Sequence, residues 1–241
     1  MKTNSTKLIP EERRRRILQL LEKEGSITVF DLSQILKVSF STVRNDLNYL
    51  EREGLIKRTH GGAIAKERFN PLFQKEIAGH AKEKLEIAKY AVQFVENDDT
   101  IFIDAGSTTL AFTEELINSN KKCHIVTNSL YIINALSNST EINLHVLGGE
   151  FIPSNMNFID LEQNFEKYKF KKAFMGINGF NEEGFYVHEL SEANFKKKII
   201  KSAKVAYILA DHSKYNKICA NLVEKWKQNY ILVTDDRKIE V

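Results

Sequence analysis

The stretch V-S-F-S-T-V-R-N-D-L-N-Y-L-E-R-E-G-L-I-K-R-T-H-G-G-A, residues 38–63, decides how the first part of the chain folds. Within it, Val43, Leu47 and Leu50 recur at i, i+4 and i+7, the spacing of one buried face of a helix. Ser39 precedes this run as an N-cap residue, and Gly54 follows it as a helix stop. The stretch therefore predicts a helix that begins after Ser39 and ends before Gly54.

The polar face of this helix carries side chains suited to contact with nucleic acid. Hydroxyl, amide and guanidinium groups read base edges and phosphates, and here they belong to Ser41, Thr42, Arg44, Asn45 and Asn48. After the helix, a His-Gly-Gly turn joins two short apolar runs, which predicts a hairpin with the basic pair Lys57 and Arg58 on its first strand. A reading helix followed by a basic hairpin is typical of a winged helix-turn-helix.

Two further helices are expected before the reading helix. Pro10 suits the first turn of a helix that Gly25 closes. Thr28, followed by Asp31, resembles a capping box that opens a second helix. The inward residues expected in this second helix are Val29, Leu32, Ile35 and Leu36. A plain three-helix bundle with a solvated polar face is the alternative, which the basic hairpin disfavours.

The basic excess of the chain lies in the same part as the reading helix. Residues 1–66 hold thirteen Lys and Arg against eight Asp and Glu, and the remainder holds twenty-two against twenty-four. The net charges are thus +5 and −2, which sum to the +3 of the whole chain. Such an excess is the electrostatic footprint that DNA phosphates require. The run Arg13–Arg16 has a second interpretation, as a solvated helix face.

Length and composition limit the class of protein. A chain of 241 residues suggests a small module and a larger one. No apolar run approaches the roughly 18 residues needed to span a bilayer, and the polar N-terminus is unlike a signal peptide. Two cysteines, Cys123 and Cys219, do not indicate a disulfide framework. We therefore expect a cytoplasmic protein.

The second part of the chain alternates between strand and helix patterns. Residues 66–75 lack periodicity and are expected to form a linker, followed by a helical pattern over residues 76–97 whose apolar stripe includes Leu85. Strands are expected at 100–104, 123–127, 142–147, 172–176 and 205–210, and helices at 108–117, 129–136 and 192–203.

This alternation predicts an α/β domain with an open, mostly parallel sheet and helices on both faces. The expected organisation is a winged helix-turn-helix domain over residues 1–65, a linker over 66–75 and an α/β domain over 76–241.

Polar or glycine-rich residues follow each expected strand. They are D-A-G-S-T-T at 104–109, T-N at 127–128, G-G at 148–149, G-I-N-G at 176–179 and D-H-S-K at 211–214. Ligands of open α/β sheets bind at these carboxyl ends, and the helix opened by Gly106 could hold a phosphate at its N-terminus. One such loop is equally an ordinary helix cap. Five such loops at one edge of the sheet favour a pocket for a small polar anion.

Other kinds of site have no support in the sequence. The six histidines and two cysteines show no metal-ligand spacing, and neither a Walker A loop nor a G-x-S-x-G motif occurs. We expect no cofactor, no metal and no catalytic residue. One member of the run Lys196–Lys198, next to Glu192, could reach a ligand.

Together these motifs resemble one family. The run E-R-R-R-R-I-L-Q-L-L at 12–21, with V-S-x-x-T-V-R-x-D-L and G-L-I-K-R-x-H-G-G-A after it, closely resembles the DeoR-type helix-turn-helix. The second part is similar to the sugar-phosphate sensor domain of that family. The motifs that carry this likeness are D-A-G-S-T-T, T-N, L-G-G, G-I-N-G, E-A-N-F-K at 192–196 and L-A-D-H-S-K at 209–214.

The resemblance implies a cytoplasmic transcriptional regulator, usually a repressor, that a phosphorylated sugar releases from operator DNA. It implies a homo-oligomer, either dimer or tetramer, and a sensor similar in fold to ribose-phosphate isomerase and coenzyme A transferases. Carried over by position, the reading helix would face the DNA, with Lys57, Arg58 and His60 in the wing. The effector pocket would be lined by Asp104, Gly106, Ser107, Thr108, Thr109, Asn128, Gly148, Gly149, Lys196, Asp211 and Lys214.

The chain departs from the family pattern at Asn45 and Asn178. Asn45 stands where the family usually has Arg; since Asn favours adenine and Arg favours guanine, we expect an altered operator preference. Asn178 stands where an Asp is common, which removes one carboxylate.

Two other functions are open at this point. Asp104, Glu192, Asp211 and Lys214 supply acid–base groups for a sugar-phosphate isomerase or transferase with an accessory DNA-binding module. Alternatively, the second domain only dimerises and its pocket is vestigial.

Overall fold

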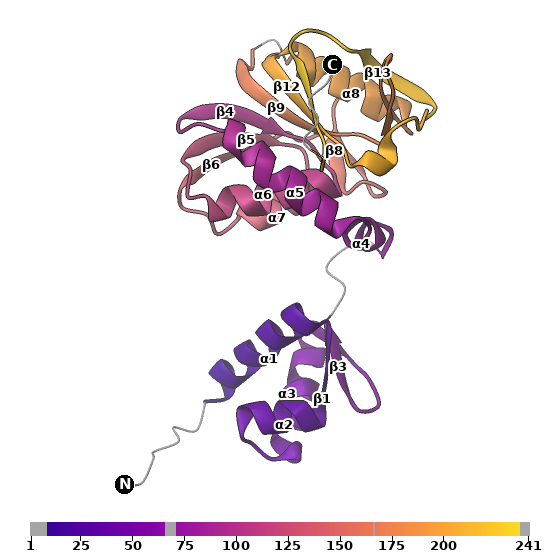
Figure 1. The fold of residues 1–241 in the computed structure, drawn as a ribbon. Helices are drawn as coiled ribbons and strands as arrows, with labels where there is room; N and C mark the ends of the chain where they lie inside the picture. Colours follow the sequence, from indigo (N-terminus) through magenta and orange to yellow (C-terminus); the bar gives the residue numbers. More distant parts are fainter. Residues whose placement is uncertain (1–8, 66–70, 166, 237–241) are drawn as a thin grey trace. The chain divides into compact units, whose positions relative to one another are not determined.

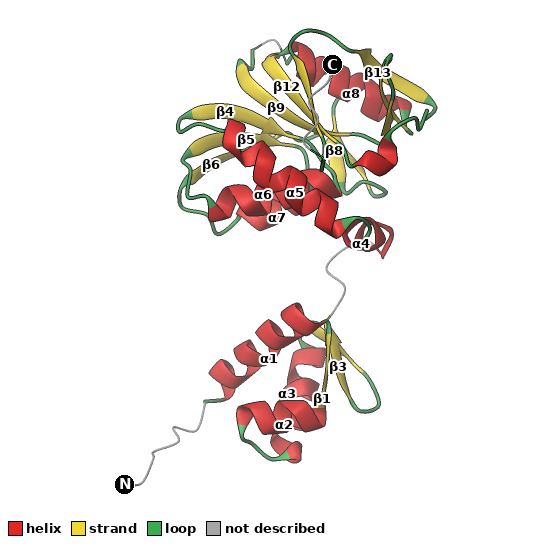
Figure 2. Cartoon of the chain, in the orientation of Figure 1, coloured by secondary structure: helices red, strands yellow, loops and turns green. Residues whose placement is uncertain are grey.

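The chain divides into two compact units, Met1–Arg68 and Phe69–Val241. The computed structural model describes residues 9–65, 71–165 and 167–236. Figure 1 shows the course of the chain through each unit, and Figure 2 shows the same elements by type.

The N-terminal unit combines helices with a small antiparallel sheet. In chain order its described elements are α1 (Pro10–Glu24), β1 (Ser26–Thr28), α2 (Val29–Leu36), α3 (Phe40–Arg52), β2 (Ile56–Arg58) and β3 (Gly62–Ala65). Both predicted N-caps are confirmed. The Thr28 hydroxyl accepts the Asp31 N–H at 3.1 Å, and the Ser39 hydroxyl accepts the Thr42 N–H at 3.2 Å.

The predicted hairpin is confirmed, and a third strand joins it. β3 lies between β1 and β2, so the sheet order is β1-β3-β2. Strand β1 has only three residues and was not predicted. Gly62 pairs with Thr28, and a Cβ at this position would lie 2.1 Å from the Ile27 carbonyl oxygen. Glycine is therefore required where β1 and β3 approach each other.

The apolar residues of these helices form the core of the N-terminal unit. Val43, Leu47 and Leu50 are buried against α1 and α2, as their spacing predicts. The expected burial of Ile35 is wrong, because its side chain is 44 % exposed. Val29, Leu32 and Leu36 fill the inward face of α2, and Ile35 projects about a quarter turn away from it.

The run Arg13–Arg16 is neither wholly solvated nor wholly available to DNA. Arg13 is buried and Arg14 half-buried, and both guanidinium groups bind the carboxylate of the buried Asp46. Only Arg15 and Arg16 are exposed, so these two can add to the positive surface.

A six-stranded sheet with the order β14-β12-β9-β4-β5-β6 is the centre of the second unit, and every pairing in it is parallel. Its strands are β4 (Asp99–Ile103), β5 (Cys123–Thr127), β6 (Ile142–Val146), β9 (Phe170–Gly176), β12 (Ala203–Leu209) and β14 (Tyr230–Val233). The predicted open parallel sheet is confirmed, with β14 as an additional edge strand.

Helices cover both faces of this sheet, as predicted. Its helices are α5 (Ala81–Ala91), α6 (Ser107–Asn118), α7 (Leu130–Leu136) and α8 (Leu190–Lys201). Ile101 and Ile103 of β4 pack with α5, α6 and α7, and Phe102 between them packs with α8 on the other face. This alternation is the period of two that places successive strand residues on opposite faces.

Short antiparallel strands flank the parallel sheet and were not predicted. β7 (Glu150–Ile152) pairs with β8 (Asn157–Ile159), and β10 (Gly179–Phe180), β11 (Gly184–Val187) and β13 (Asn221–Lys225) form a three-stranded sheet. The 3₁₀ turn η2 (His212–Lys214) follows β12.

The segment expected to be a linker partly forms a helix. Residues 66–70 lie outside the described residues, and α4 (Pro71–Ala78) occupies the rest of the expected linker. The expected long helix over residues 76–97 is divided instead, because Gly79 and the left-handed His80 (φ 54°) separate α4 from α5. A 3₁₀ turn, η1 (Val92–Phe94), follows α5, and Leu85, expected in the apolar stripe, is exposed. In the part of the chain that the structure describes, no helix is long and apolar enough to cross a membrane.

Candidate functional site

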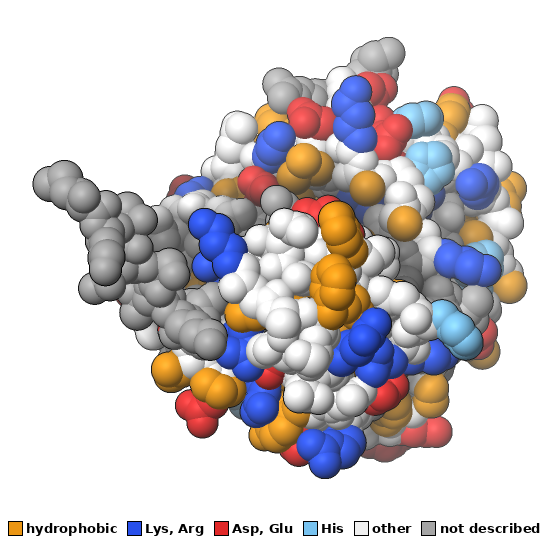
Figure 3. Space-filling model, turned by 90° about the horizontal axis from the view of Figure 1, so that it is seen from below, with side chains coloured by type: hydrophobic (Ala, Val, Ile, Leu, Met, Phe, Trp, Pro, Cys, Tyr) orange, Lys and Arg blue, Asp and Glu red, His pale blue; other side chains and the backbone are white. Residues whose placement is uncertain are grey.

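Helix α3 presents its polar face to solvent. Ser41, Arg44, Asn45 and Asn48 are exposed, and Thr42 is half-buried. In Figure 3, Lys and Arg side chains lie on either side of a group of hydrophobic side chains on the face turned to the viewer. The predicted reading residues thus share one accessible surface, while Val43 and Leu47 on the opposite side hold the helix in the core.

Three hydroxyl groups gather at the N-terminus of α3. The Ser39 hydroxyl lies 2.8 Å from that of Ser41 and 2.9 Å from that of Thr42. Hydroxyls and free N–H groups at a helix N-terminus suit a phosphate oxygen of the DNA backbone.

The wing is tied to α3 through Arg58. Its guanidinium donates to the Asn48 side-chain oxygen, and its backbone N–H donates to the Glu51 carboxylate at 3.1 Å. Lys57 and His60 of the hairpin are exposed. The structure therefore brings Asn48 and Arg58 together and leaves Lys57 and His60 accessible.

A buried ion cluster fixes α3 to α1 beneath the reading surface. The Arg13 guanidinium donates from two nitrogens to Asp46, one of them at 3.0 Å, and Arg14 Nε donates to Asp46 at 3.1 Å. Arg14 also stacks 3.7 Å above the Tyr49 ring centroid. Sequence patterns do not reveal this cluster, because Arg13 and Arg14 lie more than thirty residues from Asp46 along the chain.

In the second unit, a small cavity lies at the carboxyl ends of β4 and β9. These neighbouring strands are the point at which the chain order reverses, with β5 and β6 on one side and β12 and β14 on the other. The cavity measures about 60 Å³. It is lined by Phe73, Glu76, Ala105, Gly106, Ser107, Thr108, Asn155, Gly176, Ile177, Asn178, Glu192 and Lys214. A reversal point of this kind is where open α/β sheets bind ligands.

Hydrogen-bond donors suited to an anion converge on this cavity. Helix α6 begins at Ser107, and no described side chain caps its N-terminus. The Thr108 hydroxyl is buried and has no hydrogen-bond partner among the described residues. Lys214 Nζ donates to the Ile177 carbonyl at 2.7 Å, and burial lowers the pKa of Lys214 although Asp211 opposes this. An anion would supply the missing partner of Thr108 and a counter-charge for Lys214.

A second buried ion cluster lies beneath the cavity. Lys196 Nζ donates to Asp104 and lies 2.9 Å from Glu192, which accepts a hydrogen bond from Asn155 at 3.1 Å. Burial raises the pKa of Asp104 to about 6 against the opposing charge of Lys196. The two carboxylates outweigh the effect of burial on Lys196 and raise its pKa. Lys196 is therefore a fixed cation that positions Glu192 in the cavity wall.

Helix α4 contributes part of the cavity wall. Phe73 and Glu76 line the cavity, and Lys84 of α5 donates to the backbone carbonyls of Glu76 and Gly79. The predicted site includes neither Phe73 nor Glu76, because the sequence predicts a linker over residues 66–75 and the start of a long helix at Glu76. Asn155, from the turn between β7 and β8, was also missed.

The remaining predicted effector residues lie outside the cavity lining. Thr109 donates to the Gly106 carbonyl at 3.0 Å, and the Asp211 carboxylate accepts from Ser213. Asn128 donates to the Phe158 carbonyl at 3.0 Å. Gly148 follows β6, away from β4, and a Cβ at Gly149 would lie 2.5 Å from the Ile159 backbone. The structure thus gathers Gly106, Ser107, Thr108 and Lys214 in the lining, places Asp104 and Lys196 beneath it, and separates Asn128, Gly148 and Gly149 from it.

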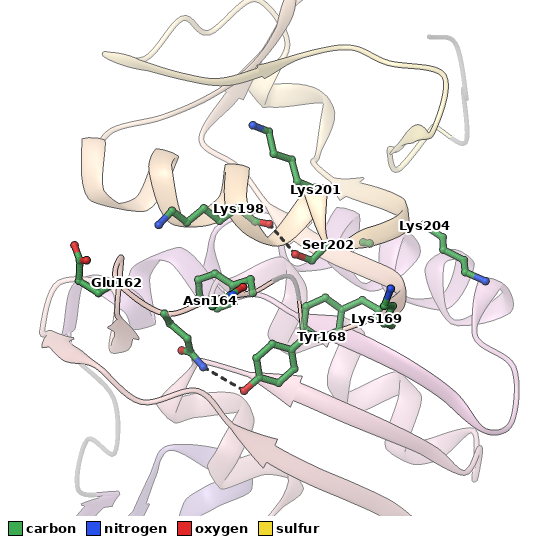
Figure 4. A pocket seen from close by; sticks show the side chains of 12 residues that line it. Glu162, Asn164, Tyr168, Lys169, Lys198, Lys201, Ser202 and Lys204 are labelled. Carbon is green, nitrogen blue, oxygen red and sulfur yellow. Dashed lines mark hydrogen bonds between the residues drawn. The ribbon is translucent and has the colours of Figure 1, made fainter.

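A larger cavity of about 690 Å³ lies at the opposite edge of the sheet, where β9 and β12 begin (Figure 4). Lys198, Lys201 and Lys204 border it, but their ammonium groups point away from one another. The Tyr168 hydroxyl, within the cavity, is already bonded to Gln163 at 3.2 Å. Hydrogen-bond donors thus converge on the smaller cavity and not on the larger one. No group of His, Cys, Asp and Glu suited to a metal ion occurs among the described residues.

Two family models match the chain. The DeoR-like helix-turn-helix domain matches residues 13–69, and the DeoR C terminal sensor domain matches residues 79–236. The chain belongs to the DeoR family of transcriptional regulators. Because the family and its relatives are regulators, the alternative of an enzyme with an accessory DNA-binding module is excluded.

Curated relatives of this DeoR-family chain align over most of their length. The regulator IolR of Bacillus subtilis (strain 168) is 38 % identical over 198 residues, 80 % of this chain and 78 % of the relative. The uncharacterized regulator FruR of the same organism is 33 % identical over 241 residues, 96 % and 94 % of the two chains. The lactose phosphotransferase system repressor of Streptococcus mutans is 35 % identical over 236 residues, 93 % and 92 % of the two chains.

Solved structures align with part of the chain. Ribose 5-phosphate isomerase A from Methanocaldococcus jannaschii has a TM-score of 0.43 and 22 % identity, and the alignment covers 57 % of this chain and 55 % of that one. The enzyme from Neisseria gonorrhoeae has a TM-score of 0.39 with 55 % and 52 % coverage.

Proposed function

We propose that this regulator represses sugar-metabolism genes in the cytoplasm and leaves its operator when a phosphorylated sugar occupies the cavity between β4 and β9. The observation that carries the proposal is the unpartnered Thr108 hydroxyl, which lies beside the α6 N-terminus and Lys214. A relative named as a repressor of a sugar phosphotransferase system supports the same class of regulated genes.

The cavity lining divides into two chemical parts. The α6 N-terminus, Thr108 and Lys214 suit a phosphate. Asn155, Asn178 and Glu192 offer amide and carboxylate groups that suit the hydroxyls of a sugar. Two chains related by a two-fold axis would place two α3 helices on the half-sites of a pseudo-palindromic operator.

Helix α4 connects the cavity to the DNA-binding unit along the chain, because it lines the cavity and is the first described element after that unit. A ligand changes DNA affinity only by its different affinity for two arrangements of the protein. A phosphate near the Glu76 carboxylate is opposed by like charge, so ligand binding favours an arrangement in which α4 has moved.

The test begins with selection of operator DNA by the ligand-free full-length protein from a random duplex library. The selected DNA is then titrated in the presence of glucose 6-phosphate, fructose 1-phosphate, fructose 6-phosphate or ribose 5-phosphate, with the unphosphorylated sugars as controls. We expect one sugar phosphate to release the DNA and to raise the melting temperature of the protein. Melting temperatures and DNA affinities that none of the four phosphates changes would contradict the proposal.

Substitution of Glu76 by Gln tests the route through α4. Removal of the like charge should preserve or strengthen binding of the releasing sugar phosphate while it reduces the ligand-induced loss of DNA affinity. Glu86→Gln, which alters an ion pair with Lys89 on the surface of α5, is the matched control. Equal release by the Glu76→Gln variant and the wild type would rule out this route.

A further inference from the structure

Two large aromatic side chains lie exposed beside each other at the start of the reading helix. Phe30 of α2 is 60 % exposed and Phe40 of α3 is 46 % exposed. Their ring centroids are 6.4 Å apart, and the planes are inclined by 41°. Single exposed apolar residues are common, but a contacting pair of phenylalanines that the core does not use points to a function at the surface.

Phe40 belongs to the reading surface by its position on α3. It is the first residue of the helix and precedes Arg44 by four residues and Asn48 by eight, so the three lie along one side. The hydroxyl cluster of Ser39, Ser41 and Thr42 surrounds the same helix end. In helix-turn-helix proteins, the N-terminal residues of the reading helix contact the base edges.

The contact between Phe30 and Phe40 makes Phe40 a defined apolar surface. Phe30 packs against one side of the ring and leaves about half of the Phe40 side chain accessible. The polar reading residues can bond to base edges, but none of them offers an aromatic face. In the major groove, the apolar feature of a base edge is the 5-methyl group of thymine, which side chains such as Phe contact.

We infer that Phe40, supported by Phe30, contacts the methyl group of a thymine in each half-site and makes the operator specific for thymine at that position. This inference rests on the DNA-binding role of α3 and is independent of the effector. It adds to the reading surface a specificity residue that hydrogen-bonding patterns would not reveal.

The test uses ligand-free full-length protein and the operator selected from the random library. Each thymine of a half-site is replaced singly by deoxyuridine, which removes only the methyl group, and affinity is measured by fluorescence anisotropy. We expect one replacement to weaken wild-type binding by about fourfold, the equivalent of one buried methyl group. The Phe40→Ala variant should bind both duplexes equally, and Phe40→Leu should retain part of the discrimination. Circular dichroism establishes that the variants are folded.

Ile35→Ala is the matched control, because Ile35 is an exposed apolar residue on another side of α2. This variant should discriminate thymine from uracil as the wild type does. The inference is overturned if no deoxyuridine replacement weakens wild-type binding, or if Phe40→Ala keeps the discrimination. It is equally overturned if Phe40→Ala leaves DNA binding unchanged but alters the mass in sedimentation, which would make the aromatic pair a protein interface. Because no effector is present, the result does not depend on whether a sugar phosphate releases the operator.

Discussion

Each unit has a buried ion cluster directly beneath its proposed binding surface, and the two clusters have opposite composition. In the N-terminal unit one carboxylate, Asp46, is bound by Arg13 and Arg14 under the reading helix. In the sensor unit one ammonium, Lys196, is bound by Asp104 and Glu192 under the cavity. The first cluster therefore carries an excess of positive charge and the second an excess of negative charge.

The difference in burial determines how well each cluster tolerates the substitution of one of its residues. The Lys196 and Asp104 side chains are 1 % exposed, whereas Arg14 is 26 % exposed and stacks on Tyr49. Removal of one partner from a fully buried pair leaves a charge that water cannot reach, and the free-energy cost is large. A half-buried guanidinium can turn to solvent instead. The sensor cluster should thus be rigid and intolerant, and the N-terminal cluster more adaptable.

Replacement of Lys196 by Met gives the largest expected effect. The variant leaves Asp104 and Glu192 without their cation, which should lower the unfolding free energy of the sensor unit by about 3–5 kcal/mol. Trp226, the single tryptophan of the chain, lies in this unit and reports its unfolding in urea by fluorescence. Lys197→Met is the matched control, since Lys197 is half-exposed and pairs only loosely with Glu224 at 3.7 Å. Similar losses in both variants would show that the Lys196 cluster has no special role.

The pH dependence of Asp104 is the next test. Its pKa is about 6 in the folded protein, above the ordinary 3.8, so the folded state holds this proton more tightly than the unfolded chain. The contribution of Asp104 to the unfolding free energy is therefore full below about pH 4 and falls by up to about 3 kcal/mol as the pH rises through about 6.

An Asp104→Asn variant lacks this titration. The difference in unfolding free energy, wild type minus variant, should thus decrease from pH 4 to pH 6 when followed by Trp226 fluorescence. Other carboxylates titrate in both proteins and cancel in the difference. A difference that increases with pH would mean that Lys196 keeps Asp104 ionised throughout.

Local features of the two units could be predicted from the sequence, whereas contacts between distant segments could not. The caps at Thr28 and Ser39 and the first five parallel strands depend on neighbouring residues, and all are confirmed. The pairing of Arg13 with Asp46 and the presence of Glu76 in the cavity wall depend on tertiary packing, which periodicity does not reveal.

The rule that ligands bind at the carboxyl ends of the strands also selects too many residues for the predicted site. Of the five predicted strands, only the ends of β4 and β9 and the segment after β12 contribute described residues to the cavity lining, because the chain order reverses between β4 and β9. The ends of β5 and β6 lie farther along the sheet, where Asn128 binds the backbone of β8 and Gly149 packs against the end of that strand. A sequence shows that strands end in polar residues, but it does not show which strands are neighbours.

Replacement of Asp46 by Asn should have an intermediate effect. The variant removes the charge that Arg13 binds through two nitrogens. We therefore expect the unfolding free energy of the N-terminal unit to fall by about 2 kcal/mol. Circular dichroism would detect an earlier loss of helix, while the Trp226 transition of the sensor unit stays unchanged. Asp31→Asn, at the exposed cap of α2, is the control. A shift of the Trp226 transition would contradict independent unfolding of the units.

Arg14→Met should have the smallest effect and is the sharpest test of the difference in burial. Asp46 keeps both hydrogen bonds from Arg13 in this variant, and the Met side chain can still cover Tyr49. We therefore expect the unfolding free energy of the N-terminal unit, measured by thermal unfolding, to fall by less than about 1 kcal/mol, as for other partly exposed ion pairs. The same substitution at the buried Arg13 should cost several times more, because Arg14 reaches Asp46 through a single nitrogen. Equal losses of unfolding free energy in the two variants would mean that both arginines contribute equally to holding Asp46. Burial would then not explain why the cluster under the reading helix tolerates substitution better than the sensor cluster.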